Sequence, residues 1–275
     1  MHLWGRKMIK LIATDLDGTI INSKGECDSS VKEAVSLARQ EGIRFAICSG
    51  RPISSYQSLL PLWGLENECD YLVGSGGGEV LEISTGKYIQ SYVLEKELLL
   101  EIIDLYEPLG IIPTLYGKDG YLYVQELTEQ TRIMCERVNI EPRVGDIRTM
   151  IGGAEIKEMF VVEPKDMEKV ERFYQEHKDD RYVGFKTAYD LFEFNHPLLA
   201  KDVGLRIIGN LMQINEEEMI AFGDTTNDIE MLEYVKYGIV TANGTDDAKK
   251  IAYAITNSVD ENGFAQYINK HIVKR

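Results

Sequence analysis

Short apolar runs alternate with amphipathic segments over the first part of the chain. The runs at 9–15, 43–48 and 71–74 are typical of buried strands, because polar or glycine-rich residues bound each of them. Apolar residues recur with helical spacing at 29–41 and in the segment that runs to about residue 63. Strands that alternate with helices pair in parallel through right-handed crossovers, so we expect an open α/β sheet.

Between residues 85 and 188 the pattern changes. Long helical segments are interleaved there with short strands rich in Tyr and Val, which indicates a separate α+β unit. After residue 195 the alternation of helix and strand returns. We therefore predict one α/β core, residues 1–84 and 189–275, interrupted by an inserted α+β domain, residues 85–188.

Two aspartates stand where the first predicted strand ends. Residues two apart in an extended chain point to the same side, so Asp15 and Asp17 are expected to face one crevice while Leu16 turns to the core. Two adjacent carboxylates repel each other, so a cation is expected between them. Gly18 permits a sharp reversal, and Thr19 supplies a hydroxyl that ties the loop. Taken alone, such a pair of aspartates is also typical of a loop with capped turns.

The segment FGDTTNDIEML at 222–232 repeats this situation. Asp224 follows an apolar strand, and Asn227 and Asp228 open a helix. Helix capping explains one of these residues, most simply Asn227, but not all three around one strand end. Together with the first pair of aspartates, Asp224 and Asp228 form a set of hard oxygen ligands that suits Mg²⁺.

Two weaker signals accompany the carboxylates. The tripeptide Ser49-Gly50-Arg51 follows the second strand, where a hydroxyl and backbone amides near a helix start are suited to hold a phosphate. A capping turn explains the same tripeptide. Lys201 begins a predicted helix, which the helix dipole makes an unfavourable place for a cation. A lysine there is often only solvated, but it is also where the counter-charge to a bound anion would be needed.

Composition narrows the possible ligands and compartments. The 275 residues carry a net charge of -15, which would repel nucleic acid and anionic lipid, so an anionic ligand requires a local metal ion, lysine or helix N-terminus. The four cysteines form no C-x-x-C pair, and a reducing cytoplasm fits them best. No run approaches the ~18 apolar residues of a membrane span. Residues 1–7 are expected to lie outside the fold.

Four segments follow one another along the chain: DLDGT at 15–19, SGR at 49–51, Lys201 and GDTTND at 223–228. They resemble the four motifs of the haloacid dehalogenase (HAD) superfamily. The insertion resembles the large cap, type C2B, of its Cof-like type IIB phosphatases. The resemblance covers nearly the whole chain from about Met8. It implies a Rossmann-like core of three layers around a parallel sheet.

The resemblance also implies roles for the acidic residues. Asp15 would be the nucleophile that forms an aspartyl-phosphate, and Asp17 would protonate the leaving oxygen and then activate water. Mg²⁺ would be bound by the Asp15 carboxylate, the Asp17 backbone carbonyl and Asp224. Asp228 would act mainly through water.

Further residues would contact the phosphate in such an enzyme. The Leu16 and Gly50 amides, Ser49 and Asn227 would hold its oxygens. Lys201 would neutralise charge on both Asp15 and the phosphoryl group.

Three departures from the family pattern leave the substrate open. Gly76-Gly77-Gly78 stands where Asn-Gly-Ala is usual, Ala200 precedes the lysine where a small polar residue is common, and ANGTDD at 242–247 replaces a usual Gly-Asn-Ala order. The segment GSGGGE at 74–79 also lacks the third glycine of a dinucleotide-binding loop. The three departures concern the rim of the site, and the missing glycine argues against a dinucleotide-binding loop.

The function expected from these observations is that of a Mg²⁺-dependent phosphatase. Its substrate would be a small phosphorylated metabolite of the sugar phosphate or pyridoxal or flavin phosphate class. A non-hydrolytic binder of a phosphorylated ligand and a phosphomutase are the alternatives. Neither nucleic acid nor a membrane is an expected partner, and the chain is expected to be a cytoplasmic monomer or weak homodimer.

Overall fold

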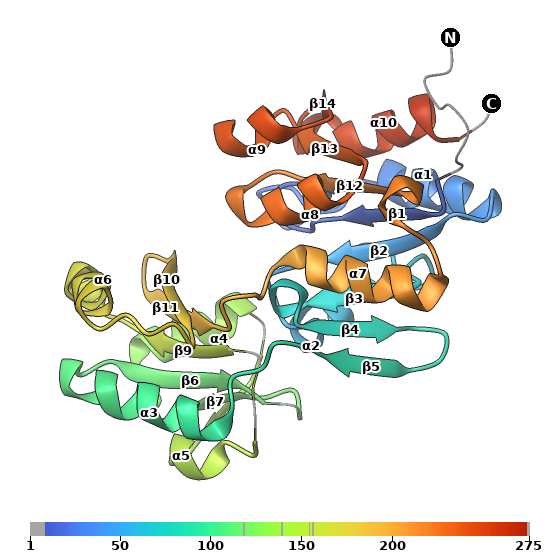
Figure 1. Cartoon of the computed structure of the whole chain (residues 1–275). Coiled ribbons are helices and arrows are strands. Elements are labelled where there is room, and N and C mark those ends of the chain that lie inside the picture. Colours follow the sequence, from blue (N-terminus) through green and yellow to red (C-terminus); the bar gives the residue numbers. More distant parts are fainter. Residues whose placement is uncertain (1–8, 118, 139, 154, 156, 274–275) are drawn as a thin grey trace. The chain divides into compact units, whose positions relative to one another are not determined.

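The computed structural model describes residues 9–273 except 118, 139, 154 and 156, and each of its two units has a sheet of its own (Figure 1). The first unit contains the chain up to Ile89 and again from Ala200, and the second is Gln90–Leu199. The prediction that residues 1–7 lie outside the fold concerns residues beyond the described range.

The sheet of the first unit has the strand order β14-β13-β12-β1-β2-β3-β4-β5. Neighbouring strands pair in parallel from β14 to β3, and β4 is antiparallel to β3. The strands are β1 (Leu11–Thr14), β2 (Arg44–Cys48), β3 (Tyr71–Gly74), β4 (Glu79–Glu82), β5 (Lys87–Gln90), β12 (Met219–Gly223), β13 (Tyr237–Thr241) and β14 (Ala254–Thr256). This is the α/β fold with a parallel sheet that the alternation of strands and helices predicts.

Helices cover both faces of this sheet. They are α1 (Ser29–Gln40), α2 (Ile53–Tyr56), α7 (Lys201–Met212), α8 (Ile229–Tyr234), α9 (Asp246–Ile251) and α10 (Gly263–His271). Alternate residues of β1 enter opposite layers: Ile12 packs with residues of α1 and α10, whereas Leu11 and Ala13 pack with residues of α7 and α8. The result is a core of three layers.

The helix expected to run to about residue 63 is shorter than predicted. The segment α2 ends at Tyr56 and a single 3₁₀ turn follows at Gln57–Leu59. Pro61 lacks the N–H that a continuing helix needs, and Gly64 adopts a φ of 67°. These two residues turn the chain toward β3.

The second unit contains a sheet in the order β10-β11-β9-β6-β7-β8, in which every pair is antiparallel except β7 with β8. Its strands are β6 (Ile112–Tyr116), β7 (Leu122–Val124), β8 (Pro142–Val144), β9 (Lys157–Val161), β10 (Val183–Ala188) and β11 (Leu191–Asn195). Its helices are α3 (Lys96–Tyr106), α4 (Glu129–Val138), α5 (Ile147–Met150) and α6 (Met167–Glu176). An aromatic cluster that includes Tyr106, Phe160 and Phe194 forms part of its core.

The bounds of this unit differ from the predicted insertion at 85–188. The strand β5, at Lys87–Gln90, still belongs to the first sheet, and β11 pairs with β9 and β10 in the second. Both ends of the second unit therefore lie later in the chain than the change in sequence pattern. Among the residues that the structure describes, every helix is too short or too polar to span a bilayer.

Candidate active site

Three neighbouring parallel strands place their following residues at one edge of the first sheet. Asp15, Ser49 and Asp224 come directly after β1, β2 and β12. The strands are in register, with Thr14 opposite both Ile47 and Phe222. The carboxyl ends of parallel strands are the usual ligand-binding edge of an open α/β sheet.

A buried cluster of carboxyl groups surrounds Lys201 at this edge. Carboxylate oxygens of Asp15, Asp224 and Asp228 lie within 4.8 Å of one another. The Lys201 Nζ donates hydrogen bonds to Oδ1 of Asp15 at 2.5 Å and to Oδ1 of Asp228 at 2.6 Å. The lysine is 1% exposed and is the first residue of α7. Its unfavourable place at a helix start is therefore offset by two carboxylates.

Burial dominates the electrostatics of this cluster. It raises the pKa of Asp15 to about 8 against the opposing charge of Lys201, and it raises the pKa of Asp224 to about 6, with Asp228 adding to the shift. Burial alone would lower the pKa of Lys201, but the charges of Asp15 and Asp228 outweigh it and raise that pKa. One ammonium group faces three carboxyl groups, so the cluster favours a further cation.

The loop after β1 holds Asp224 through two adjacent residues. Thr19 Oγ1 donates to Asp224 Oδ1 at 3.2 Å, as expected for a hydroxyl that ties this loop. Gly18 has a φ of 83°, and a Cβ there would lie 2.4 Å from Asp224 Oδ2, so this position requires glycine. Asn243 Nδ2 donates to the Gly18 carbonyl at 2.8 Å. No role was expected for Asn243, although the segment 242–247 departs from the family pattern.

Asp228 is fully buried and uses both oxygens within the chain. Oδ1 accepts from Lys201, and Oδ2 accepts from the backbone N–H groups of Asp224 and Thr225 at 2.9 and 3.0 Å. These bonds orient the loop that carries Asp224. Asp228 therefore acts on the cluster through its position and charge.

The side chain of Asp17 forms an ion pair with Arg51. Its carboxylate is half exposed and accepts two hydrogen bonds from Arg51, from Nε at 2.8 Å and from Nη2 at 2.7 Å. Asp17 is not one of the three carboxyl groups of the buried cluster, but its charge still acts on Asp224. Leu16, between the two aspartates, is buried in the core as predicted. That Asp15 and Asp17 face one crevice stays a prediction.

The residues expected to hold phosphate oxygens lie on two neighbouring loops. Ser49 is buried, and its Oγ accepts from the Arg51 backbone N–H at 3.1 Å. Asn227 is exposed, and its Oδ1 accepts from Thr225 Oγ1 at 2.7 Å. A Cβ built on Gly50 would lie 3.9 Å from Asn227 Nδ2. The structure thus brings Ser49, Gly50 and Asn227 together beside the buried cluster.

The glycine-rich loop after β3 supports this arrangement. The backbone N–H groups of Ser75 and Gly76 donate to the carbonyls of Arg51 and Ser49 at 2.8 and 3.0 Å. These bonds fix the backbone of the tripeptide that carries Ser49. The glycines of this loop depart from the family pattern, and no role was expected for them.

Gly77 in the same loop packs against the start of α7. It has a φ of 105°, and a Cβ there would lie 2.0 Å from the Ala200 carbonyl oxygen. Only glycine allows this approach next to Lys201. The two departures at 76–78 and at Ala200 are therefore in contact with each other.

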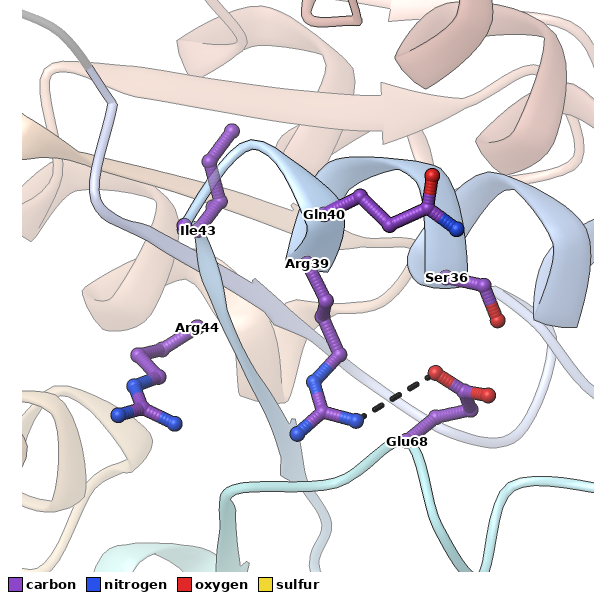
Figure 2. Close-up of a pocket in the computed structure, with 7 residues that line it drawn as sticks. Ser36, Arg39, Gln40, Ile43, Arg44 and Glu68 are labelled. Atoms are coloured by element: carbon purple, nitrogen blue, oxygen red, sulfur yellow. Dashed lines mark ion pairs between the residues drawn. The ribbon is translucent and has the colours of Figure 1, made fainter.

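A separate pocket lies at the other end of β2, where α1 ends (Figure 2). Its volume is about 510 Å³, and its lining residues are Ser36, Arg39, Gln40, Gly42, Ile43, Arg44 and Glu68. Arg39 pairs with Glu68 and with Asp70, and Arg44 pairs with Asp70 at 2.7 Å. Acidic groups already neutralise the arginines of this pocket, so it is poorly suited to bind an anionic ligand.

A model of the haloacid dehalogenase-like hydrolases matches residues 12–268 of the chain. The chain belongs to this family. The family predicted from the motifs is thereby confirmed. The match includes every site residue described above.

Relatives and solved structures match over nearly the same length. A candidate phosphatase of Streptococcus pyogenes serotype M6 is 28% identical over 266 residues, covering 96% of this chain and 99% of the relative. A 5-amino-6-(5-phospho-D-ribitylamino)uracil phosphatase of Bacillus subtilis is 24% identical over 286 residues, covering 95% and 98%.

Among solved structures, a haloacid dehalogenase-like hydrolase from Bacteroides thetaiotaomicron superposes with a TM-score of 0.86 at 24% identity, covering 95% of this chain and 99% of that one. A HAD subclass IIB sugar phosphatase superposes with a TM-score of 0.76 at 20% identity, covering 95% and 98%. These two likenesses concern the fold.

Proposed function

We propose that this hydrolase is a Mg²⁺-dependent phosphatase that cleaves small phosphorylated metabolites through an aspartyl-phosphate on Asp15. The observation that carries the proposal is the buried contact of Asp15 with Lys201, with Asp224 and Asp228 in the same cluster. A phosphate ester brings negative charge to a carboxylate nucleophile, so the site must supply positive charge. Lys201 supplies part of it.

The donor set of the cluster fits Mg²⁺. Carboxylate and carbonyl oxygens are the ligands that this ion prefers, and Asp15 and Asp224 present carboxylates within one small volume. The Asp17 backbone carbonyl is the proposed third protein ligand. Asp228 already accepts three hydrogen bonds within the chain, which supports a role through water. When bound, Mg²⁺ would offset the repulsion between carboxylate and phosphate and stabilise the transferring group.

The proposed reaction has two steps. In the first, an Asp15 oxygen attacks phosphorus while the bond from phosphorus to the ester oxygen breaks, and Asp17 gives that oxygen its proton. In the second, water attacks the phosphorus of the aspartyl-phosphate and loses a proton to Asp17, which releases phosphate and restores the Asp15 carboxylate. Covalent capture divides one difficult displacement into two easier ones.

The non-bridging phosphate oxygens are assigned to the loop residues beside the cluster. The Ser49 hydroxyl, the Asn227 amide and the backbone N–H groups of Leu16 and Gly50 would donate to them. The closeness of Gly50 to the Asn227 side chain supports this assignment. Lys201 would neutralise charge on the phosphoryl group and on Asp15.

The proposed substrates are sugar phosphates or phosphates of the pyridoxal or flavin class. The similarity to a phosphatase of a phosphoribitylamino-uracil supports this class. The second unit, Gln90–Leu199, is inserted between the motif at Ser49 and the motif at Lys201. We propose that it serves as the cap domain, type C2B, and contributes to the choice of substrate.

A panel of metabolite phosphates tests the proposal. Purified protein is assayed for phosphate release with Mg²⁺ and with EDTA, and the Asp15→Asn variant serves as the inactive control. We expect Mg²⁺-dependent release from at least one monoester. Absence of release from every compound would favour a phospho-ligand binder, and transfer of the phosphate to a second sugar hydroxyl would favour a phosphomutase.

A further inference from the structure

Arg51 forms a bidentate pair with Asp17, and the chemistry proposed above gives this arginine no role. We infer that Arg51 is the positioning residue of Asp17, which fixes the plane and place of the carboxyl group that serves the leaving oxygen. The inference rests on the proposed function, since it concerns the acid and base of that reaction. It assigns a role to the third residue of the tripeptide 49–51.

The backbone of Arg51 is fixed on both sides. Its N–H donates to Ser49 Oγ at 3.1 Å, and its carbonyl accepts from the Ser75 N–H at 2.8 Å. Two residues later, the Ile53 N–H donates to Glu79 Oε2 at 3.0 Å, and the same oxygen accepts from Ser75 Oγ at 2.9 Å. The guanidinium group therefore projects from a point that the loops around it determine.

The backbone of Asp17 is fixed in a different way. The turn after it closes with the Gly18 N–H donating to the Ile21 carbonyl at 2.8 Å, and Asp17 forms an isolated bridge with Ile21. This leaves the side-chain torsions of Asp17 as its remaining freedom. The two bonds from Arg51 remove that freedom, so the arginine decides where the carboxyl group lies.

The form of the contact is specific to arginine. Nε and Nη2 each donate to a different oxygen of Asp17, so the planar guanidinium sets the plane of the carboxylate as well as its position. Lysine at this position would keep the charge but not the plane. Comparison of the two side chains therefore separates orientation from charge.

The exposure of the pair argues against a purely structural role. The side chains of Arg51 and Asp17 are 34% and 50% exposed. Ion pairs of this kind contribute little to stability, because water and salt screen them.

The chain offers a matched control at Arg44. This arginine pairs with Asp70 at 2.7 Å at the opposite end of β2, away from the buried cluster. Its side chain is 57% exposed. Arg44→Lys makes the same chemical change as Arg51→Lys without touching Asp17.

The experiment compares two phosphate monoesters with Mg²⁺ present. The leaving oxygen of p-nitrophenyl phosphate is weakly basic and needs little protonation, whereas that of an alkyl ester such as glycerol phosphate needs a proton. Positioned acids contribute about 10² to 10⁴ in rate. We expect Arg51→Lys and Arg51→Gln to lower kcat for the alkyl ester about tenfold or more. Their kcat for the aryl ester and their KM for both esters should change little. The control Arg44→Lys should match the parent protein on both esters.

A double variant shows whether the two residues act together. Asp17→Asn should give the same preference for the aryl ester, and adding Arg51→Lys to it should cause no further loss. Additive losses with a raised KM would show that Arg51 binds substrate directly, and equal losses on both esters with a lowered Tm would show a structural role. Either result overturns the inference.

Activity of the parent protein separates the two proposals. If the parent releases phosphate and the Arg51 variants match it on both esters, the inference fails and the proposed function stands. If the parent releases phosphate from neither these esters nor the metabolite panel, the proposed function fails, and the inference fails with it.

Discussion

Lys201 and Asp15 are 186 positions apart in the chain, and Lys201 Nζ lies 2.5 Å from Oδ1 of Asp15, with both side chains buried. The same Nζ contacts Asp228. Because the two carboxylates share one buried ammonium group, removal of Lys201 leaves both of them buried without a cation. The contact is therefore expected to affect the stability of the folded chain as well as its chemistry.

We expect Lys201→Met to destabilise the metal-free protein by about 3–5 kcal/mol, because it leaves Asp15 and Asp228 buried without their cation. Urea unfolding in EDTA measures the difference. Lys10→Met is the control, since Lys10 pairs with Glu218 on the surface and is 48% exposed. A loss for Lys201→Met no larger than that of the control would contradict the electrostatic account.

Asp15→Asn should abolish phosphate release while Mg²⁺ binding largely survives. The amide cannot form the acyl phosphate, but it retains an oxygen next to Asp224. Release is measured on the best substrate of the panel, and Mg²⁺ binding is measured by calorimetry. Turnover near that of the parent protein would rule out Asp15 as the nucleophile.

Mg²⁺ should stabilise the folded chain, because it binds a cluster that exists only after folding. At a free concentration about 100 times its Kd, it would add about 2.7 kcal/mol to the free energy of unfolding. Asp224→Asn should reduce this gain, whereas Asp247→Asn should not, since Asp247 accepts from Thr226 outside the cluster. Equal stabilisation of both variants would place the ion elsewhere.

The convergence of Asp15, Ser49 and Asp224 could be predicted from the sequence. Each follows an apolar run, and the ends of neighbouring parallel strands must meet at one edge of the sheet. This conclusion needed only the identity and order of the elements. The pairing of Lys201 with Asp15 was implied by the family resemblance, because the helix start alone left a solvated lysine as the alternative.

The ion pair of Asp17 with Arg51 could not be predicted in this way. It joins two loops that follow different strands, and their conformations depend on distant hydrogen bonds, such as that from Ser75 to the Arg51 carbonyl. The role of Asn243 at the Gly18 carbonyl was inaccessible for the same reason.

The glycine loop after β3 gives a prediction that depends on a close approach rather than on charge. Gly77 and Gly76 both have positive φ, at 105° and 66°. A Cβ at Gly77 would lie 2.0 Å from the Ala200 carbonyl oxygen, whereas a Cβ at Gly76 would meet nothing within 4 Å. Gly76→Ala should therefore cost only the strain of a left-handed alanine, about 1–2 kcal/mol.

Gly77→Ala should cost more than Gly76→Ala, because the backbone at the start of α7 must move in addition. That movement displaces Lys201 from Asp15, so phosphate release should fall for Gly77→Ala and change little for Gly76→Ala. Urea unfolding and phosphate release are measured on both variants. Equal stability and equal activity of the two variants would show that the loop does not hold the start of α7, and the contact of Gly77 with Ala200 would then have no part in placing the lysine.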